Sequence, residues 1–130
     1  MSPFSSPASL ARQYQADTIK TASKEKILMM MFDGALRFAR QAQTRMRDRD
    51  VAGAGLALGR LQAIIGELNA ALDHSIGGET SRNLARLYQY ASECIVASNI
   101  SRRAEGLDIV VKIVTAIREG FDGAIRSLAQ

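Results

Sequence analysis

The positions of its two prolines constrain the fold of this 130-residue chain more than any other feature. Pro3 and Pro7 both lie within the first seven residues, and no proline follows them. Proline breaks a helix because it lacks an amide N–H and because its ring clashes with the preceding turn. Aromatic residues make up only 5% of the chain and runs of β-branched residues are short, which disfavours strands. The sequence therefore predicts an all-α protein.

The spacing of the apolar residues predicts four helices, because they recur at steps of three and four as on one face of a helix. The stripes are Leu28, Met31, Ala35, Phe38 and Ala42; Ala54, Leu58, Leu61, Ile65, Leu68 and Leu72; Leu84, Leu87, Tyr88, Ala91, Cys94 and Ile95; and Leu107, Val111, Val114, Ile117, Phe121, Ile125 and Leu128. Ser23, Asp50 and Ser101 are candidate N-caps. The expected helices cover residues 24–47, 51–75, 79–98 and 102–128. Short connections make successive helices antiparallel, which predicts an up-down four-helix bundle.

The first 22 residues lack this sustained periodicity and are rich in Ser, Ala and Gln. We expect them to form a flexible, partly helical N-terminal arm, with the bundle domain over residues 23–130. On the arm, Leu10, Tyr14 and Ile19 are placed to form a small apolar patch.

A second set of apolar residues lies away from these stripes. Ile27 to Phe32 are six apolar residues in succession, and at roughly 100° per residue Met29, Met30 and Phe32 fall about 80–140° from the centre of the core stripe. Further off-core positions follow at helical spacing in the second and fourth helices: Ala57, Ile64 and Ala71, and Ile109, Ile113, Ala116 and Gly120. Either these residues are buried at helix–helix flanks in a wide core, or they form apolar grooves for a partner helix.

The charge distribution is compatible with two interpretations. The net charge is +4, and part of the excess is concentrated in one stretch: Arg37, Arg40, Arg45, Arg47 and Arg49. Such a stretch is typical of a solvated helix face, and it also suits an acidic partner or nucleic acid. We do not expect nucleic-acid binding, because the sequence lacks the recognition signatures and the aromatics are not interleaved with the basic residues.

The titratable residues do not predict an enzyme or a metal site. His74 is the only histidine, so a histidine cluster is excluded, and no two carboxylates stand at catalytic spacing. Cys94 is the only cysteine and cannot form an internal disulfide. No apolar run approaches the length of about 20 residues that spans a bilayer, and the N-terminus lacks the pattern of a secretory signal. We expect no cofactor, no stable membrane insertion and a cytoplasmic location.

Several motifs together resemble the flagellar export chaperone family FliS. They are Tyr14-Gln15 before Thr21-Ala22-Ser23, the run MMFDGALRFARQA from Met30 to Ala42, the turn from Leu72-Asp73 to Gly77-Gly78-Glu79, and Asn83-Leu84, Leu87-Tyr88, Tyr90 and residues 97–100. The resemblance covers most of residues 14–125 in the same order. The chain departs from the family in having Lys24-Glu25-Lys26 where proline and acidic residues are usual, Phe32 where tyrosine is commoner, and Ala91-Ser92 where a bulkier apolar residue is common.

The resemblance implies a four-helix bundle without catalysis that binds the disordered C-terminal segment of flagellin. It further implies that the bundle prevents premature polymerisation and delivers flagellin to the flagellar type III export gate machinery. The candidate groove residues are then Met29, Met30, Phe32, Ala57, Ile64, Ala71, Ile109, Ile113, Ala116 and Gly120, and the arm residues that cover them are Leu10, Tyr14 and Ile19. The alternative is a homodimer or larger homo-oligomer in which the same apolar stripes form the self-interface.

Overall fold

The computed structural model describes residues 6–18 and 22–128, and these are almost entirely helical. The elements are α1 (Pro7–Thr18), α2 (Ala22–Arg47), α3 (Val51–Ala70), α4 (His74–Gly77), α5 (Glu79–Ser101), the 3₁₀ turn η1 (Ala104–Leu107) and α6 (Asp108–Leu128). The described residues contain no strand. The all-α prediction is confirmed.

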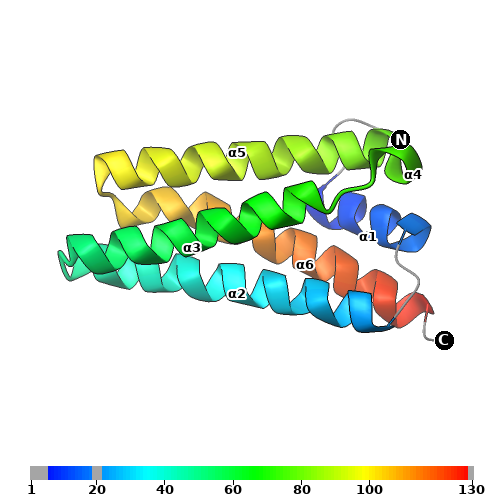
Figure 1. The fold of residues 1–130 in the computed structure, drawn as a ribbon, viewed down its shortest axis with the longest axis horizontal. Helices are drawn as coiled ribbons and strands as arrows, with labels where there is room; N and C mark the ends of the chain where they lie inside the picture. The colour runs from blue at the N-terminus through cyan, green and yellow to red at the C-terminus, as the bar shows by residue number, and fades with distance from the viewer. Residues whose placement is uncertain (1–5, 19–21, 129–130) are drawn as a thin grey trace.

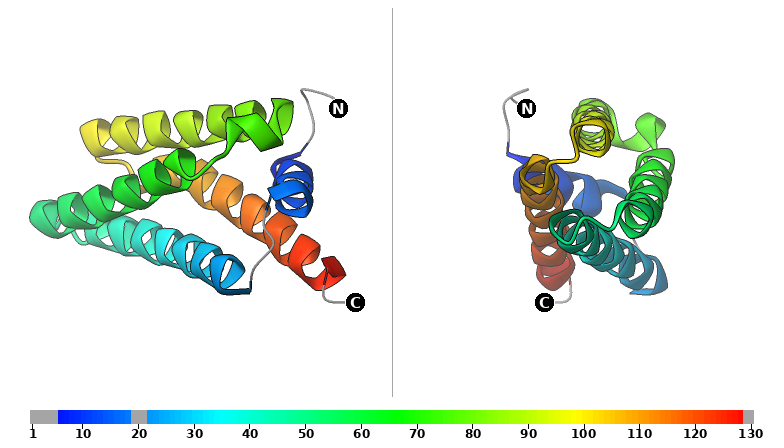
Figure 2. Two further views of the ribbon diagram at one scale, coloured as in Figure 1. Left: turned by 45° about the vertical axis from the view of Figure 1, so that its right-hand side comes forward. Right: turned by 90° about the vertical axis from the view of Figure 1, so that its left-hand side faces the viewer.

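The four long helices α2, α3, α5 and α6 form a bundle in which each helix runs opposite to the one before it (Figure 1). α2 packs against α3 on one flank and against α6 on the other, and α3 packs against α5. α5 and α6 diverge toward one end of the bundle, and α1 lies between them there (Figures 1 and 2). The short α4 sits at the same end as α1.

The core contains side chains from all the long helices and from α1. Its largest fully buried members include Phe32, Leu61, Leu84, Ile117 and Phe121. On α1, Leu10, Ala11 and Tyr14 are buried in the same cluster. The described part of the predicted arm is therefore a helix packed into the core.

Several helix ends differ from the prediction. α2 begins at Ala22, so Ser23 lies inside the first turn and is not the N-cap. Asp50 does cap α3, because its Oδ1 accepts the Gly53 N–H at 2.9 Å, which confirms that prediction. α3 ends at Ala70 rather than residue 75, and the chain reaches α5 through α4 and Gly78, whose φ of +56° suits glycine.

The start of the last helix also differs from the prediction. α5 extends to Ser101, so Ser101 does not cap a following helix, and α6 begins only at Asp108. Arg102 ends α5 in the left-handed conformation, with its N–H bonded to the Ser98 carbonyl at 2.8 Å. η1 then occupies the connection.

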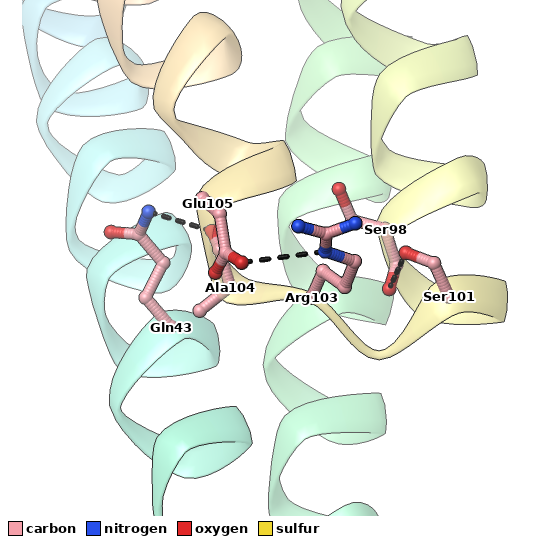
Figure 3. A network of polar contacts seen from close by, with 6 residues as sticks. All are labelled: Gln43, Ser98, Ser101, Arg103, Ala104 and Glu105. Carbon is pink, nitrogen blue, oxygen red and sulfur yellow. Dashed lines mark hydrogen bonds and ion pairs between the residues drawn. The ribbon is translucent and has the colours of Figure 1, made fainter.

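Polar contacts hold η1 in place (Figure 3). The buried Gln43 of α2 donates from Nε2 to the Ala104 carbonyl at 3.0 Å and to Asp108 Oδ1 at 2.7 Å. Arg103 and Glu105 form an ion pair at 3.4 Å, and a backbone hydrogen bond and this arginine lower the pKa of Glu105. Since Gln43 is buried, its two bonds fix the position of the α5–α6 connection against α2.

By length and composition, α3 could cross a membrane. Its hydropathy comes from seven Leu, Ile and Val residues, and the helix also contains Arg60 and Glu67. Leu58, Leu61, Ile65 and Leu68 are buried in the bundle, whereas Val51 and Leu56 are exposed. One face of α3 is therefore that of a core helix, and core helices of soluble bundles meet the same criterion.

Candidate binding surface

The ten predicted groove residues fall into three groups by exposure. The buried ones are Phe32, Ala57, Ile113 and Gly120; the partly buried ones are Met29, Ile64 and Ala116; the exposed ones are Met30, Ala71 and Ile109. The structure therefore does not bring all ten together as one open groove.

Phe32 belongs to the core, and its predicted off-core position is wrong. Its side chain is fully buried, and its ring centroid lies 5.3 Å from that of Phe121 on α6. Ala57 and Ile113 are likewise only 5% and 6% exposed. Because α3 and α6 flank α2 on two sides, the buried arc of each helix is wider than a single stripe. For these three residues the wide-core interpretation is the right one.

Gly120 is buried beneath the backbone of α1. A Cβ atom added at this position would overlap the carbonyl group of Ala8. The small residues at this end of the α6 stripe thus permit a close helix–helix approach, and the approaching backbone belongs to α1. At Gly123, one turn further on, an added methyl group would lie 3.6 Å from its nearest neighbour, Arg12 Nε, which is an ordinary contact distance.

Tyr14 fastens α1 to the rest of the bundle. Its hydroxyl accepts the Asp73 N–H at 2.8 Å and donates to the Ala71 carbonyl at 3.4 Å. Its ring meets that of Phe121 edge-on, with centroids 6.0 Å apart. The residues Tyr14, Leu68, Tyr88 and Phe121 help to enclose a cavity of only about 30 Å³, so the packing here is nearly closed.

The pKa of Tyr88 reflects the exclusion of water from this region. Burial, with a smaller contribution from Tyr14, raises the pKa of the Tyr88 hydroxyl well above its ordinary value. Leu10 and Tyr14 therefore do cover an apolar interior, but it is the space between α5 and α6 rather than Met30, which remains 64% exposed. Ile19, the third predicted covering residue, lies outside the described residues.

Exposed apolar side chains occur on two further surfaces, one on α2 and one on α3 and α5. Few of the predicted groove residues lie on them. Ile27 lies beside Met30 on α2 and is 58% exposed. Val96 and Ile100 on α5 are 49% and 78% exposed, and Leu56 on α3 is 62% exposed. The sequence prediction missed Val96 and Ile100, although their i, i+4 spacing on the side of α5 opposite Ala91 was a usable signal.

The register between α3 and α5 places these side chains. Gln62 Nε2 donates to the Ser92 carbonyl at 3.3 Å, and Ser92 Oγ donates to Gln62 Oε1 at 2.8 Å. Since the helices are antiparallel (Figure 1), moving along α5 from Ser92 to Ile100 moves back along α3 toward Ala54. The exposed apolar residues of α5 therefore lie near the end of the bundle that contains the α2–α3 turn.

The arginine-rich part of α2 borders an open hollow of about 810 Å³. Its lining residues are Asp33, Leu36, Arg37, Arg40, Gln41, Thr44 and Arg45. Asp33 pairs with Arg118 at 2.6 Å, and this hydrogen bond raises the pKa of the guanidinium group. Arg45 pairs with Asp50 at 3.3 Å, and Arg37 stacks over the Phe38 ring. Two of the five arginines of this stretch, Arg37 and Arg45, are therefore engaged within the protein.

The described residues offer no metal centre, since no three of their His, Cys, Asp or Glu side chains are grouped so as to hold an ion. The candidate site therefore consists of an apolar surface, the helix α1 that covers part of it, and charged residues at its borders.

Comparisons with known proteins show which family this chain is similar to. The family model described as flagellar protein FliS matches residues 7–128. The flagellar secretion chaperone FliSB of Pseudomonas aeruginosa is 32% identical over 116 residues, covering 86% of this chain and 92% of that protein. The flagellar secretion chaperone FliS of Bacillus subtilis is 31% identical over 114 residues, with 88% and 84% covered. That of Salmonella typhimurium is 31% identical over 104 residues, with 79% and 77% covered. The chain therefore belongs to the FliS family, a family of flagellar chaperones and not of enzymes.

Proposed function

We propose that this flagellar chaperone acts in the cytoplasm on flagellin. In this proposal it binds the disordered C-terminal segment of flagellin, keeps flagellin from polymerising early and delivers it to the flagellar export gate. The support from relatives is that the matched proteins are flagellar secretion chaperones. The support from the structure is the way in which α1 is held.

The packing of α1 is the observation that carries the proposal. α1 is a separate 12-residue helix that places Leu10, Ala11 and Tyr14 in the core and its backbone against Gly120. An amphipathic client helix of similar size would make the same kinds of contact with α5 and α6. We therefore infer that α1 occupies a binding position that the client takes over when it binds.

The exposed candidates extend this position into a longer path. Met30 and Ile109 are exposed, and Met29, Ile64 and Ala116 are partly buried beside the core. Covering one such Ile or Met completely contributes about 1.5–3 kcal/mol. The ordering of a disordered client opposes this gain. Methionine side chains also adapt to irregular partner surfaces, which suits reversible binding.

Binding of flagellin with and without its C-terminal segment tests the proposal. Calorimetric titration of the full-length chaperone with intact flagellin should show binding, and truncation of the C-terminal segment should remove it. The isolated C-terminal segment should compete with intact flagellin. Equal affinity for intact and truncated flagellin would contradict the proposed client segment.

The exposed side chains Leu56, Val96 and Ile100 also favour the alternative, a self-interface between copies of this chain. Sedimentation over a range of protein concentrations separates the two. A monomer at all concentrations leaves these side chains to a different partner, whereas a stable dimer that fails to bind flagellin would support the self-interface.

A further inference from the structure

A second concave site lies at the end of the bundle remote from α1. It is a cavity of about 370 Å³. Its lining comes from the α2–α3 turn and the end of α5, which lie at the end of the bundle opposite α1 (Figure 1). Its lining residues are Met46, Arg49, Asp50, Val51, Ala54, Asn99 and Arg102. This volume lies within the range of about 300–1,000 Å³ that is usual for ligand sites. The cavity is separate from the α1-covered region and does not depend on the proposed client.

Two arginines at this cavity occupy backbone positions that favour glycine. Arg49 and Arg102 both have φ of +58°. Around Arg49 the Asp50 N–H bonds to the Arg45 carbonyl and the Arg49 N–H to the Met46 carbonyl, which is the Schellman pattern whose left-handed residue is commonly glycine. A side chain in this conformation is strained. Strain that persists at a cavity is a reason to ask what the side chain does there.

The residues that line the cavity carry an excess of positive charge. Among the described residues, neither the Arg49 nor the Arg102 guanidinium forms an ion pair. Asp50, the one acidic lining residue, already pairs with Arg45 and caps the Gly53 amide. The N-terminal end of α3 and the C-terminal ends of α2 and α5 all lie here, so the helix dipoles add no net positive charge and the excess comes from the two arginines. An anionic group would therefore be attracted to the mouth of the cavity.

The remaining lining residues define what should accompany the anion. Ala54 is buried, Met46 is partly buried, and Val51 is 53% exposed, so the floor and one wall are apolar. Asn99 and the Asp50 carboxylate add polar groups that can bond to amides. Each carboxylate oxygen of Asp50 can accept a further hydrogen bond besides those from Arg45 and Gly53, and Asn99 is exposed. A peptide would use these groups through its amides, whereas a fatty acid matches only the arginines and the floor.

We propose that this cavity binds the free C-terminal carboxylate of a peptide whose last side chain is apolar. The carboxylate lies between the guanidinium groups of Arg49 and Arg102, which form charge-assisted hydrogen bonds with it. The last side chain contacts Met46, Val51 and Ala54. The preceding backbone amide is within the polar border that Asp50 and Asn99 provide.

A pair of matched peptides tests the ligand chemistry. The probes are acetyl-Gly-Ala-Leu with a free carboxylate and the same peptide with a C-terminal amide, titrated into the full chain by calorimetry. The free carboxylate should bind at least tenfold more tightly than the amide. Equal affinities would overturn the proposal, and so would octanoate binding more tightly than the peptide acid, which would make the cavity a fatty-acid site.

Glycine substitutions test the two arginines without endangering the fold. Arg49→Gly and Arg102→Gly fit the left-handed conformation, so each variant should melt at or above the wild-type temperature. Each should nevertheless lose at least tenfold in affinity for the peptide acid. Arg82→Gln removes the same charge from an exposed position at the other end of α5 and should bind normally. Wild-type affinity in both glycine variants would contradict the proposed roles.

Discussion

The two ends of the bundle are completed in different ways. At one end α1 fills the space between α5 and α6, and the cavity left among Tyr14, Tyr88 and Phe121 is only about 30 Å³. At the other end two turns leave an open cavity of about 370 Å³, bordered by Arg49 and Arg102. The first end is closed by apolar contacts from the chain itself, and the second remains open and positively charged.

We infer from this difference that one small bundle can recognise two kinds of partner. At the α1 end the chain supplies its own cover, so a partner must compete with Leu10, Tyr14 and the backbone contact at Gly120. At the turn end neither arginine forms an ion pair within the described chain, and no helix of the described chain fills the cavity. Apolar competition should govern affinity at the first end, and charge should govern it at the second.

The largest expected effect comes from deleting one ring of the aromatic pair beneath the closed end. Phe32→Ala deletes a fully buried ring that contacts Phe121 and should lower the free energy of unfolding by about 3–5 kcal/mol. Met30→Ala, two residues earlier and 64% exposed, should change it by less than about 0.5 kcal/mol. Urea denaturation followed by circular dichroism measures both. Similar losses in the free energy of unfolding of the two variants would contradict the burial of Phe32 at this end.

The contact between α1 and α6 can be broken by one methyl group. Gly120→Ala places a Cβ against the Ala8 carbonyl and should cost about 1–3 kcal/mol through overpacking. Gly123→Ala meets only ordinary contacts and should be neutral or stabilising by up to about 1 kcal/mol.

The same pair of variants tests whether α1 can detach from the bundle as a unit. If α1 moves off as a unit, Gly120→Ala should increase binding of a hydrophobic dye and protease cleavage within residues 7–18, with the helicity of the bundle retained. Unchanged dye binding and cleavage would contradict the close approach of α1.

The hydroxyl of Tyr14 makes a smaller contribution to the closed end. Tyr14→Phe keeps the ring against Phe121 but removes the acceptor of the Asp73 N–H and the donor to Ala71. The expected loss is about 1 kcal/mol. Tyr90→Phe alters a side chain that is 50% exposed, where water replaces lost bonds, and should have almost no effect. Thermal melts of the two variants compare them, and an equal shift would argue against the bonds of Tyr14.

The sequence predicted the fold class because the three-and-four spacing of apolar residues states directly which face of each helix is buried. It misplaced Phe32 because a helix with neighbours on two flanks buries a wider arc than one stripe, and the neighbours are not visible in local spacing. It named Leu10 and Tyr14 as an apolar patch but could not place them, since a 12-residue helix is stabilised by its tertiary contacts.

The sequence did not predict the cavity at the open end, for a related reason. Its shape depends on the two turns in which Arg49 and Arg102 adopt the left-handed backbone conformation. Arginine does not indicate such a turn locally, because this conformation is commonly taken by glycine. The last helix expected from the sequence accordingly begins at residue 102, whereas Arg102 in the structure ends α5.

The smallest expected effect is a dependence of stability on alkaline pH at the closed end. Burial raises the pKa of Tyr88, so the folded protein keeps this proton to a higher pH than the unfolded chain, whose tyrosines titrate near pH 10. The stabilisation is complete below about pH 10 and is lost as the pH rises above it, by less than about 1 kcal/mol at about pH 10.5. In Tyr88→Phe this contribution is absent, so its free energy of unfolding should fall less steeply than that of the wild type. Parallel urea-derived curves for the two proteins between about pH 8 and pH 10.5 would show that water reaches Tyr88 and that α1 does not close this end.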